Sequence, residues 1–318
     1  MKIFKLSMLC VTAAIAFGDI AAAQSLGIGA GRQGSQNYAS NAGLASFLTE
    51  EAGMDLRVQS YGGSGQSMPL IDAGRLDLQL VPSPEFEEAA GGKGAFKGRQ
   101  LSQLRVLASL SPSVVGFMVR ADSPYTKVSD IAGKTITYGY SAQPNLVTQV
   151  EGMLAAAGLS IDEMEPVMVP SVPNGVDEFI AGAADVAFFA LQGGKTREAD
   201  AAVGIRWLAL DDTPEAEAAM QGVLPTGYIK TVEPGPTAVG VAEPTPMMGY
   251  DYVLVAGAHV SDEVVAKILG ALHDDPDGVR AIRSTFSEFA VDTMAPDFGG
   301  LPYHPAAVAY YKSVGLMD

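Results

Sequence analysis

Short apolar runs rich in β-forming residues alternate with helix-length segments along the whole chain. In one clear case Leu56 and Val58 alternate with Arg57 and Gln59, as expected for a strand with one buried face. The runs predicted to be strands are residues 26–30, 56–59, 78–81, 105–110, 114–120, 135–140, 167–169, 186–190, 206–210 and 252–256. Strands separated by helix-length segments are typical of an α/β fold.

Two helices are indicated by their periodicity and their first residues. Leu44, Phe47 and Leu48 recur at the helical period in a segment that begins at Tyr38. Ser261 precedes two acidic residues and an apolar stripe, which is typical of a helix N-terminus.

The length of the chain favours two lobes. At 318 residues it exceeds the size that a single hydrophobic core usually supports. Residues 72–78 are echoed by residues 181–186: in both segments a helix ends at Gly, an Asp follows and a buried strand begins. We interpret the proline-rich stretch 224–246 as a return crossing between the lobes. The predicted division is residues 24–116 and 239–318 for lobe 1 and residues 117–238 for lobe 2.

The first 23 residues resemble an export signal. Lys2 and Lys5 precede an apolar stretch that is too short to span a bilayer, and a run of alanines ends at Ala23. We therefore expect cleavage before Gln24 and a periplasmic location. Cys10 is the only cysteine and would be removed with the signal, so the mature chain is expected to have no disulfide.

The formal net charge is −16, and removal of the signal would make it about −17, because the signal carries a net charge of +1. Such a charge argues against binding to nucleic acid or to anionic lipid surfaces. Any anionic ligand must then be held by local positive potential against the overall field.

Three loops rich in glycine and hydroxyl groups each join a predicted strand to a predicted helix: residues 29–38, 62–67 and 139–145. Such loops direct unpaired backbone N–H groups and the positive end of a helix toward the crevice beyond the strands. A carboxylate is the natural occupant of that crevice. Arg32 lies inside the first loop and is either a partner for the ligand's carboxylate or a surface charge.

No cofactor and no catalytic set are expected. The first loop matches G-x-G-x-x-G, but a dinucleotide site also needs an acidic residue at the end of the second strand, which here ends in Gln59 and two hydroxyl residues. His259, His273 and His304 lack metal-ligand spacing. With no nucleophile–base pair either, we expect a binding protein rather than an enzyme.

Several segments in a fixed order resemble the TAXI family, the solute-binding subunits of one class of TRAP transporters. The resemblance covers nearly the whole chain after the signal. It is carried by residues 31–38, 61–64, 104–110, 119–123, 128–134 and 184–189, and by the ending at 302–305 and 310–312. Arg32-Gln33 departs from the family, which usually has small Gly and Thr residues at this place.

The resemblance implies a two-lobed type II periplasmic binding protein fold with the ligand between the lobes. It also implies a protein that captures a small organic anion, such as a glutamate-like amino acid, 2-oxoglutarate or a related carboxylate, for a TRAP membrane permease. Separately from the resemblance, we expect the protein to be a monomer. Two alternatives stay open: a sensory binding protein that signals to a membrane receptor kinase, and an enzyme on the same fold.

The three loops are expected to converge on a single crevice. The predicted ligand-binding residues are Arg32, Gln33, Gly34, Ser35, Asn37, Tyr38, Gly63, Ser64, Ser83, Ser109, Tyr140, Ser141, Asn145, Phe189 and Gln192.

Overall fold

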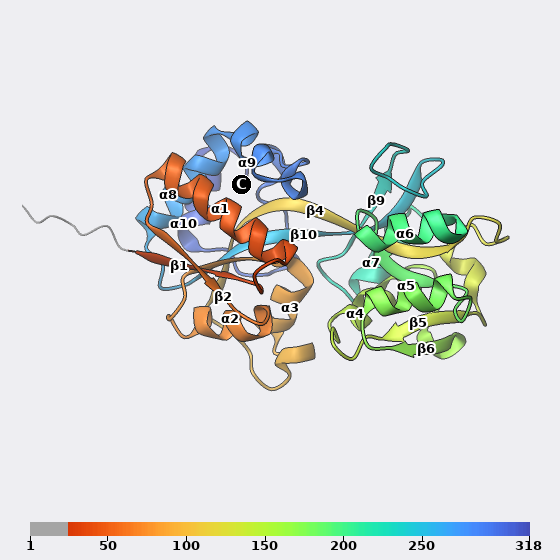
Figure 1. Cartoon of the computed structure of the whole chain (residues 1–318). Helices are drawn as coiled ribbons and strands as arrows, with labels where there is room; N and C mark the ends of the chain where they lie inside the picture. Colours follow the sequence, from red (N-terminus) through yellow and green to blue (C-terminus); the bar gives the residue numbers. More distant parts are fainter. Residues whose placement is uncertain (1–24) are drawn as a thin grey trace, which may run out of the picture.

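The protein consists of two lobes joined by two long strands (Figure 1). The structure is a computed structural model that describes residues 25–318, so the predicted signal peptide, residues 1–23, lies outside the described residues. Both ends of the described chain (red and blue) build one lobe, called lobe 1. The middle of the chain (green) builds the other, called lobe 2.

Lobe 1 is built on parallel strands that each run into a helix. β1 pairs in parallel with β2 on one side and with β3 on the other. The bounds are β1 (Leu26–Ala30), α1 (Gln36–Ala52), β2 (Leu56–Ser60), α2 (Ser64–Asp72), β3 (Leu78–Pro82) and α3 (Ser83–Gly91), with α8 (Asp262–Asp274), α9 (Pro276–Ile282) and α10 (Pro305–Ser313) at the end of the chain. The first three predicted strands are thereby confirmed. The starts of α1, α2 and α3 lie at the same edge, because parallel strands share their carboxyl ends.

Two long antiparallel strands, β4 (Leu104–Arg120) and β10 (Thr245–Gly257), run through both lobes. The prediction of two separate strands around Pro112 is wrong, because the structure has one continuous strand there. A proline fits inside this strand because only β10 pairs with it at that point; β7 pairs with β4 only from Val115 onward.

Lobe 2 combines a parallel pair with strands added to β4 and β10. β5 pairs in parallel with β6, β7 and β8 pair with β4, and β9 pairs with β10. The bounds are β5 (Thr135–Gly139), α4 (Leu146–Ala156), β6 (Glu165–Val169), α5 (Val172–Ile180), β7 (Ala187–Ala190), α6 (Gly194–Val203), β8 (Ile205–Trp207), α7 (Pro214–Gln221) and β9 (Tyr228–Val232). Short 3-10 turns lie at Gly94–Phe96, Val128–Ile131, Ile161–Glu163, Ser284–Phe286 and Val291–Thr293.

Each lobe has its own buried core, as two folding units require. Leu44 and Leu48 of α1 pack with Leu269 of α8 in lobe 1, as the helical period predicted. Phe117 and Phe188 pack together in lobe 2. Within residues 25–318, no helix combines the length and the hydropathy needed to cross a membrane.

The proline-rich stretch holds a strand that the sequence did not reveal, β9. Beyond β9, Ala238 and Val241 are buried with Trp207 of lobe 2, and the Trp207 indole N–H donates to the Val239 carbonyl at 2.7 Å. The chain then passes back toward lobe 1 along β10. The residue boundaries given for the lobes stay predictions.

Candidate functional site

A cleft of about 550 Å³ lies between the lobes, at the edge where the helices of lobe 1 begin. The first two predicted loops supply one wall, and the third predicted loop and β7 supply the other. The predicted residues that line it are Arg32, Ser35, Asn37, Gly63, Ser64, Asn145 and Phe189. The other lining residues are Gly31, Gly62, Pro82, Glu85, Val115, Ala142, Gln143, Leu146, Gln149, Val172, Phe188, Ala190, Tyr250 and Tyr252.

The first loop is held in place by its own side chains. The Ser35 hydroxyl caps α1 by accepting from the Tyr38 N–H at 3.1 Å, and Asn37 Oδ1 accepts from the Gly31 N–H at 2.7 Å. A Cβ at Gly31 would lie 3.0 Å from Ser35 Oγ, so a side chain there would force the Ser35 side chain to shift. Arg32 is exposed at the cleft and forms no ion pair within residues 25–318.

The second loop presents the start of α2. The Gly62 N–H donates to Gln66 Oε1 at 2.9 Å, which closes the turn ahead of the helix. Gly63 is the N-cap residue, and a Cβ on it would meet no atom within 4 Å. The backbone at this turn is therefore open to the cleft, at the positive end of the helix. The Ser64 hydroxyl donates to Glu85 of α3.

The third loop brings the start of α4 to the opposite wall. Gln143 Oε1 accepts from the Val172 N–H at 3.3 Å and so ties this loop to the start of α5. Asn145 is the N-cap residue of α4, and its Nδ2 donates across the cleft to Glu85 Oε1 at 3.3 Å. This contact joins the two lobes directly.

Two tyrosines of β10 line the cleft where the connecting strands pass between the lobes. The rings of Tyr250 and Tyr252 are tilted, with centroids 6.1 Å apart. Burial raises the pKa of Tyr250, and the Tyr250 phenol together with burial raises the pKa of Tyr252. Both phenols therefore stay protonated. Neither tyrosine was predicted to line the site, although the alternation Tyr250-Asp251-Tyr252 in a strand places both rings on one face.

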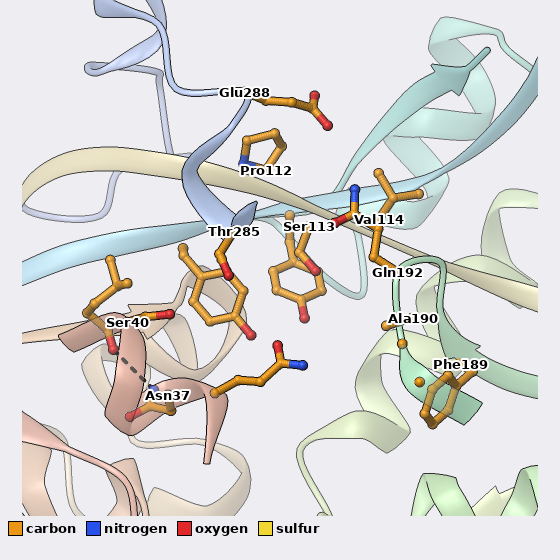
Figure 2. A pocket seen from close by; sticks show the side chains of 16 residues that line it. Asn37, Ser40, Pro112, Ser113, Val114, Phe189, Ala190, Gln192, Thr285 and Glu288 are labelled. Atoms are coloured by element: carbon orange, nitrogen blue, oxygen red, sulfur yellow. Dashed lines mark hydrogen bonds between the residues drawn. The ribbon is translucent and has the colours of Figure 1, made fainter. Parts of the chain in front are cut away.

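A second hollow of about 320 Å³ shares residues with the cleft (Figure 2). Asn37, Phe189 and both β10 tyrosines line both spaces, and Gln192 lines only the second. Figure 2 shows Asn37 of α1 on one side of this hollow and Phe189 and Gln192 on the other. The predicted residue Gln192 thus lies in a continuation of the cleft.

Tyr140 does not line the cleft, although it was predicted to converge there. Its ring is fully buried in the core of lobe 2, and its hydroxyl donates to the Thr137 carbonyl at 2.6 Å. Its φ of 39° turns the backbone at the end of β5, and the ring packs 6.1 Å from Phe188. Packing the large aromatic ring of Tyr140 in the apolar core is more favourable than exposing it at the cleft, so the ring is buried.

The remaining predicted residues lie beside the cleft or away from it. Ser83 is buried, and its hydroxyl accepts from the Asp251 N–H at 3.3 Å. Ser109 lines a different hollow of about 370 Å³. Tyr38 is half-buried on α1, and none of the described hollows includes it. The exposed residues Gln33, Gly34 and Ser141 belong to the predicted loops, but they line none of the described hollows either.

The cleft is lined by an acidic side chain, Glu85, and a cationic one, Arg32. Desolvation raises the pKa of Glu85, while the Ser64 hydrogen bond opposes this rise and the nearby Glu88 adds to it. Arg32 is the only arginine or lysine among the lining residues of the described cleft. The described residues hold no cluster of three or more His, Cys, Asp or Glu side chains arranged to bind a metal ion. The lining residues of the cleft thus offer hydrogen-bonding groups, charged side chains and aromatic rings.

Two α/β lobes joined by two strands, with a polar cleft between them, define the fold of periplasmic solute-binding proteins. Residues 28–315 match the model of the NMT1-like family, and the chain belongs to this family.

Solved structures with low sequence identity share the fold. The TctC solute-binding protein from Polaromonas matches with a TM-score of 0.57 and 10% identity, over 92% of this chain and 97% of that chain. The periplasmic aliphatic sulphonate binding protein SsuA from Escherichia coli matches with a TM-score of 0.50 and 17% identity, over 93% of this chain and 84% of that chain. PhnD1 from Prochlorococcus marinus, in complex with methylphosphonate, matches with a TM-score of 0.51 and 11% identity, over 92% of this chain and 99% of that chain. These matches confirm the predicted fold class.

Proposed function

We propose that this protein is an extracytoplasmic solute-binding protein that captures a small organic anion in the interlobe cleft and delivers it to a membrane transporter. The proposed ligand class is a glutamate-like amino acid, 2-oxoglutarate or a related carboxylate. The proposed transporter is a TRAP permease, in line with the resemblance to the TAXI family. The protein is further proposed to act as a monomer in the periplasm, without catalysis.

One observation carries the ligand class. The starts of α1, α2 and α4 all face one cleft that also holds Arg32. Helix N-termini and an arginine are the groups that proteins use to bind carboxylates. They provide local positive potential in a chain whose formal charge is −16. The two-lobed fold supports the transport role, because lobe closure around a ligand can report its presence to a partner.

The test is a thermal-shift panel on protein purified from the periplasm of an expression host. The panel contains glutamate, glutamine, 2-oxoglutarate, succinate, malate, an alkanesulfonate, a sugar and NADH. For a Kd of about 1 μM, 1 mM ligand stabilises the native state by about 4 kcal/mol and raises the Tm by roughly 5–10 °C. We expect a carboxylate to give the largest shift. A shift from the sugar or NADH alone would contradict the proposed ligand class.

A pull-down from membranes separates the proposed role from a sensory one. With the best ligand of the panel bound, the protein should retain TRAP permease subunits. Retention of a receptor kinase in their place would support the sensory alternative.

A further inference from the structure

An acidic side chain stands inside a cleft whose other features favour an anion. Glu85 lies in the first turn of α3 and faces the same cleft as Arg32. It accepts one hydrogen bond from Ser64 of lobe 1 and one from Asn145 of lobe 2. Its carboxylate therefore sits between the two walls that a ligand would touch.

These two hydrogen bonds leave acceptor capacity on the carboxylate. An ionised carboxylate accepts up to about four hydrogen bonds, and Ser64 and Asn145 supply two. No salt bridge within residues 25–318 involves Glu85. A carboxylate removed from water without a cationic partner is costly, and it is this desolvation that raises the pKa of Glu85.

A second acceptor without a partner lies on the opposite wall. Gln149 of α4 lines the cleft with 1% of its surface exposed, and its Oε1 has no hydrogen-bond partner in the part of the chain that the structure describes. Buried amide oxygens are almost always paired in folded proteins. An acceptor from each lobe is thus left to be satisfied in one cleft.

We propose that Glu85 and Gln149 form a subsite for a cationic nitrogen of the ligand, so that the protein selects an amino acid over the corresponding 2-oxo acid. This inference rests on the proposed function and makes it more specific. In it, Arg32 and the helix starts bind the ligand's carboxylate, and the subsite binds its ammonium group.

The chemistry of the two ligand classes gives the subsite its selectivity. An ammonium group carries three N–H donors and a positive charge, so it can satisfy both Glu85 and Gln149 and offset the desolvation of the carboxylate. A 2-oxo group carries only acceptor lone pairs. It would face two further acceptors and leave both unsatisfied, the arrangement by which binding sites reject an isosteric ligand most strongly.

The test is calorimetry with matched pairs of ligands that differ only at this position. Two suitable pairs are L-glutamate with 2-oxoglutarate and L-leucine with 4-methyl-2-oxopentanoate. For the pair with the better side chain, we expect the amino acid to bind on the order of 100-fold more tightly than its oxo partner. Glu85→Gln should reduce amino-acid affinity by about 30-fold or more, while leaving oxo-acid affinity equal or improved.

Two further variants make the result decisive. Glu87→Gln is the matched control, because Glu87 lies on the same helix but outside the cleft and hydrogen-bonds Thr226. It should preserve the preference for the amino acid. Gln149→Leu removes the second acceptor, which lies on the other lobe. It should lower the affinity for the amino acid about fivefold without lowering the affinity for the oxo acid. This variant tests the subsite even if Glu85→Gln fails to fold.

The outcomes separate this inference from the proposed function. Equal or tighter binding of the oxo acid to the unmodified protein would overturn the subsite and leave carboxylate capture standing. The subsite would also be overturned if Glu85→Gln and Gln149→Leu each lowered the affinity for the amino acid and for the oxo acid by the same factor. Failure of every carboxylate to bind would overturn both proposals.

Discussion

Arg32 is the residue on which carboxylate binding depends most directly. It lines the cleft and forms no ion pair within residues 25–318. It follows Gly31 in the loop that ends at Ser35, the residue that caps α1. Arg32→Ala should lower carboxylate affinity about tenfold, because a hydrogen bond to a charged group is worth about 1.5–3 kcal/mol and Arg32 is partly screened by water. Calorimetry measures the loss. Arg57→Ala is the matched control, because Arg57 is an exposed residue of β2, and it should leave carboxylate affinity unchanged. If the two variants bind the carboxylate with equal affinity, Arg32 is a surface charge.

Tyr140 is the residue whose role differs most from its predicted one. Its hydroxyl bonds the Thr137 carbonyl inside the core of lobe 2, away from the ligand. Tyr140→Phe should therefore lower stability by about 1 kcal/mol and the Tm by roughly 1–2 °C, while ligand affinity stays unchanged. Calorimetry of unfolding and of binding on the same sample checks both parts. If Tyr140→Phe instead weakens ligand binding and leaves the Tm unchanged, the Tyr140 hydroxyl contacts the ligand, as predicted from the sequence.

Among the elements, α3 carries the contacts that the sequence did not predict. Glu85 accepts a hydrogen bond from Asn145 of lobe 2, Glu87 accepts one from the Thr226 hydroxyl of lobe 2, and Thr148 of lobe 2 acts on Glu88 by lowering its pKa. Desolvation is the largest cause of a raised pKa at all three carboxyls. The helix thus places a row of partly buried acids against the other lobe.

Glu88 gives this row a measurable pH dependence. Its pKa is raised in the folded protein, so its protonation stabilises the fold; that contribution is fully present below the usual carboxyl pKa of about 4.5 and is lost as the pH rises through the folded value. Glu88→Gln removes the ionisation. At pH 8 the variant should have a higher Tm than the unmodified protein, and the difference should vanish near pH 4. A constant difference at all pH values would contradict this account.

How well an element could be predicted depended on how local its signal is. β2 and the Ser261 cap of α8 were visible because alternation and capping are local patterns, and the Val264 N–H does donate to Ser261 Oγ, at 3.4 Å. β9 was missed because prolines surround it and its partner β10 lies beyond them in the chain. The continuity of β4 past Pro112 was missed for a related reason, since it depends on which neighbours pair there.

At the scale of the whole molecule, the convergence of the loops was predictable and the acidic side of the cleft was not. Parallel strands share their carboxyl ends, so loops after β1 and β2 must meet. Glu85 and Gln149 reach the cleft only because α3 and α4 face one another across the lobes. Ser83-Pro84-Glu85 after a strand was a usable signal for a helix start, whereas Gln149 in the first turn of α4 gave none.

The contacts of α3 with lobe 2 predict how the lobes are held together. The Thr226 hydroxyl hydrogen-bonds Glu87, the Thr148 side chain lowers the pKa of Glu88, and neither threonine lines the ligand cleft. Replacing both by valine keeps their shape and removes about 1 kcal/mol from the lobe contact for the Thr226 hydrogen bond, and less for Thr148. Because the lobes are expected to rotate about β4 and β10, the closed population should fall, and ligand affinity should fall with it by about tenfold.

Small-angle scattering with and without L-glutamate or the best ligand of the panel measures this directly. A compact chain of this length has a radius of gyration of about 19 Å, and the ligand-bound forms should approach it. Without ligand, the Thr148→Val/Thr226→Val variant should be more extended than the unmodified protein, and saturating ligand should make the two equal. Thr49→Val serves as the control, because the Thr49 hydroxyl bonds the Ala45 carbonyl within α1. Identical radii for all three proteins without ligand, at identical affinities, would show that α3 does not hold the lobes closed.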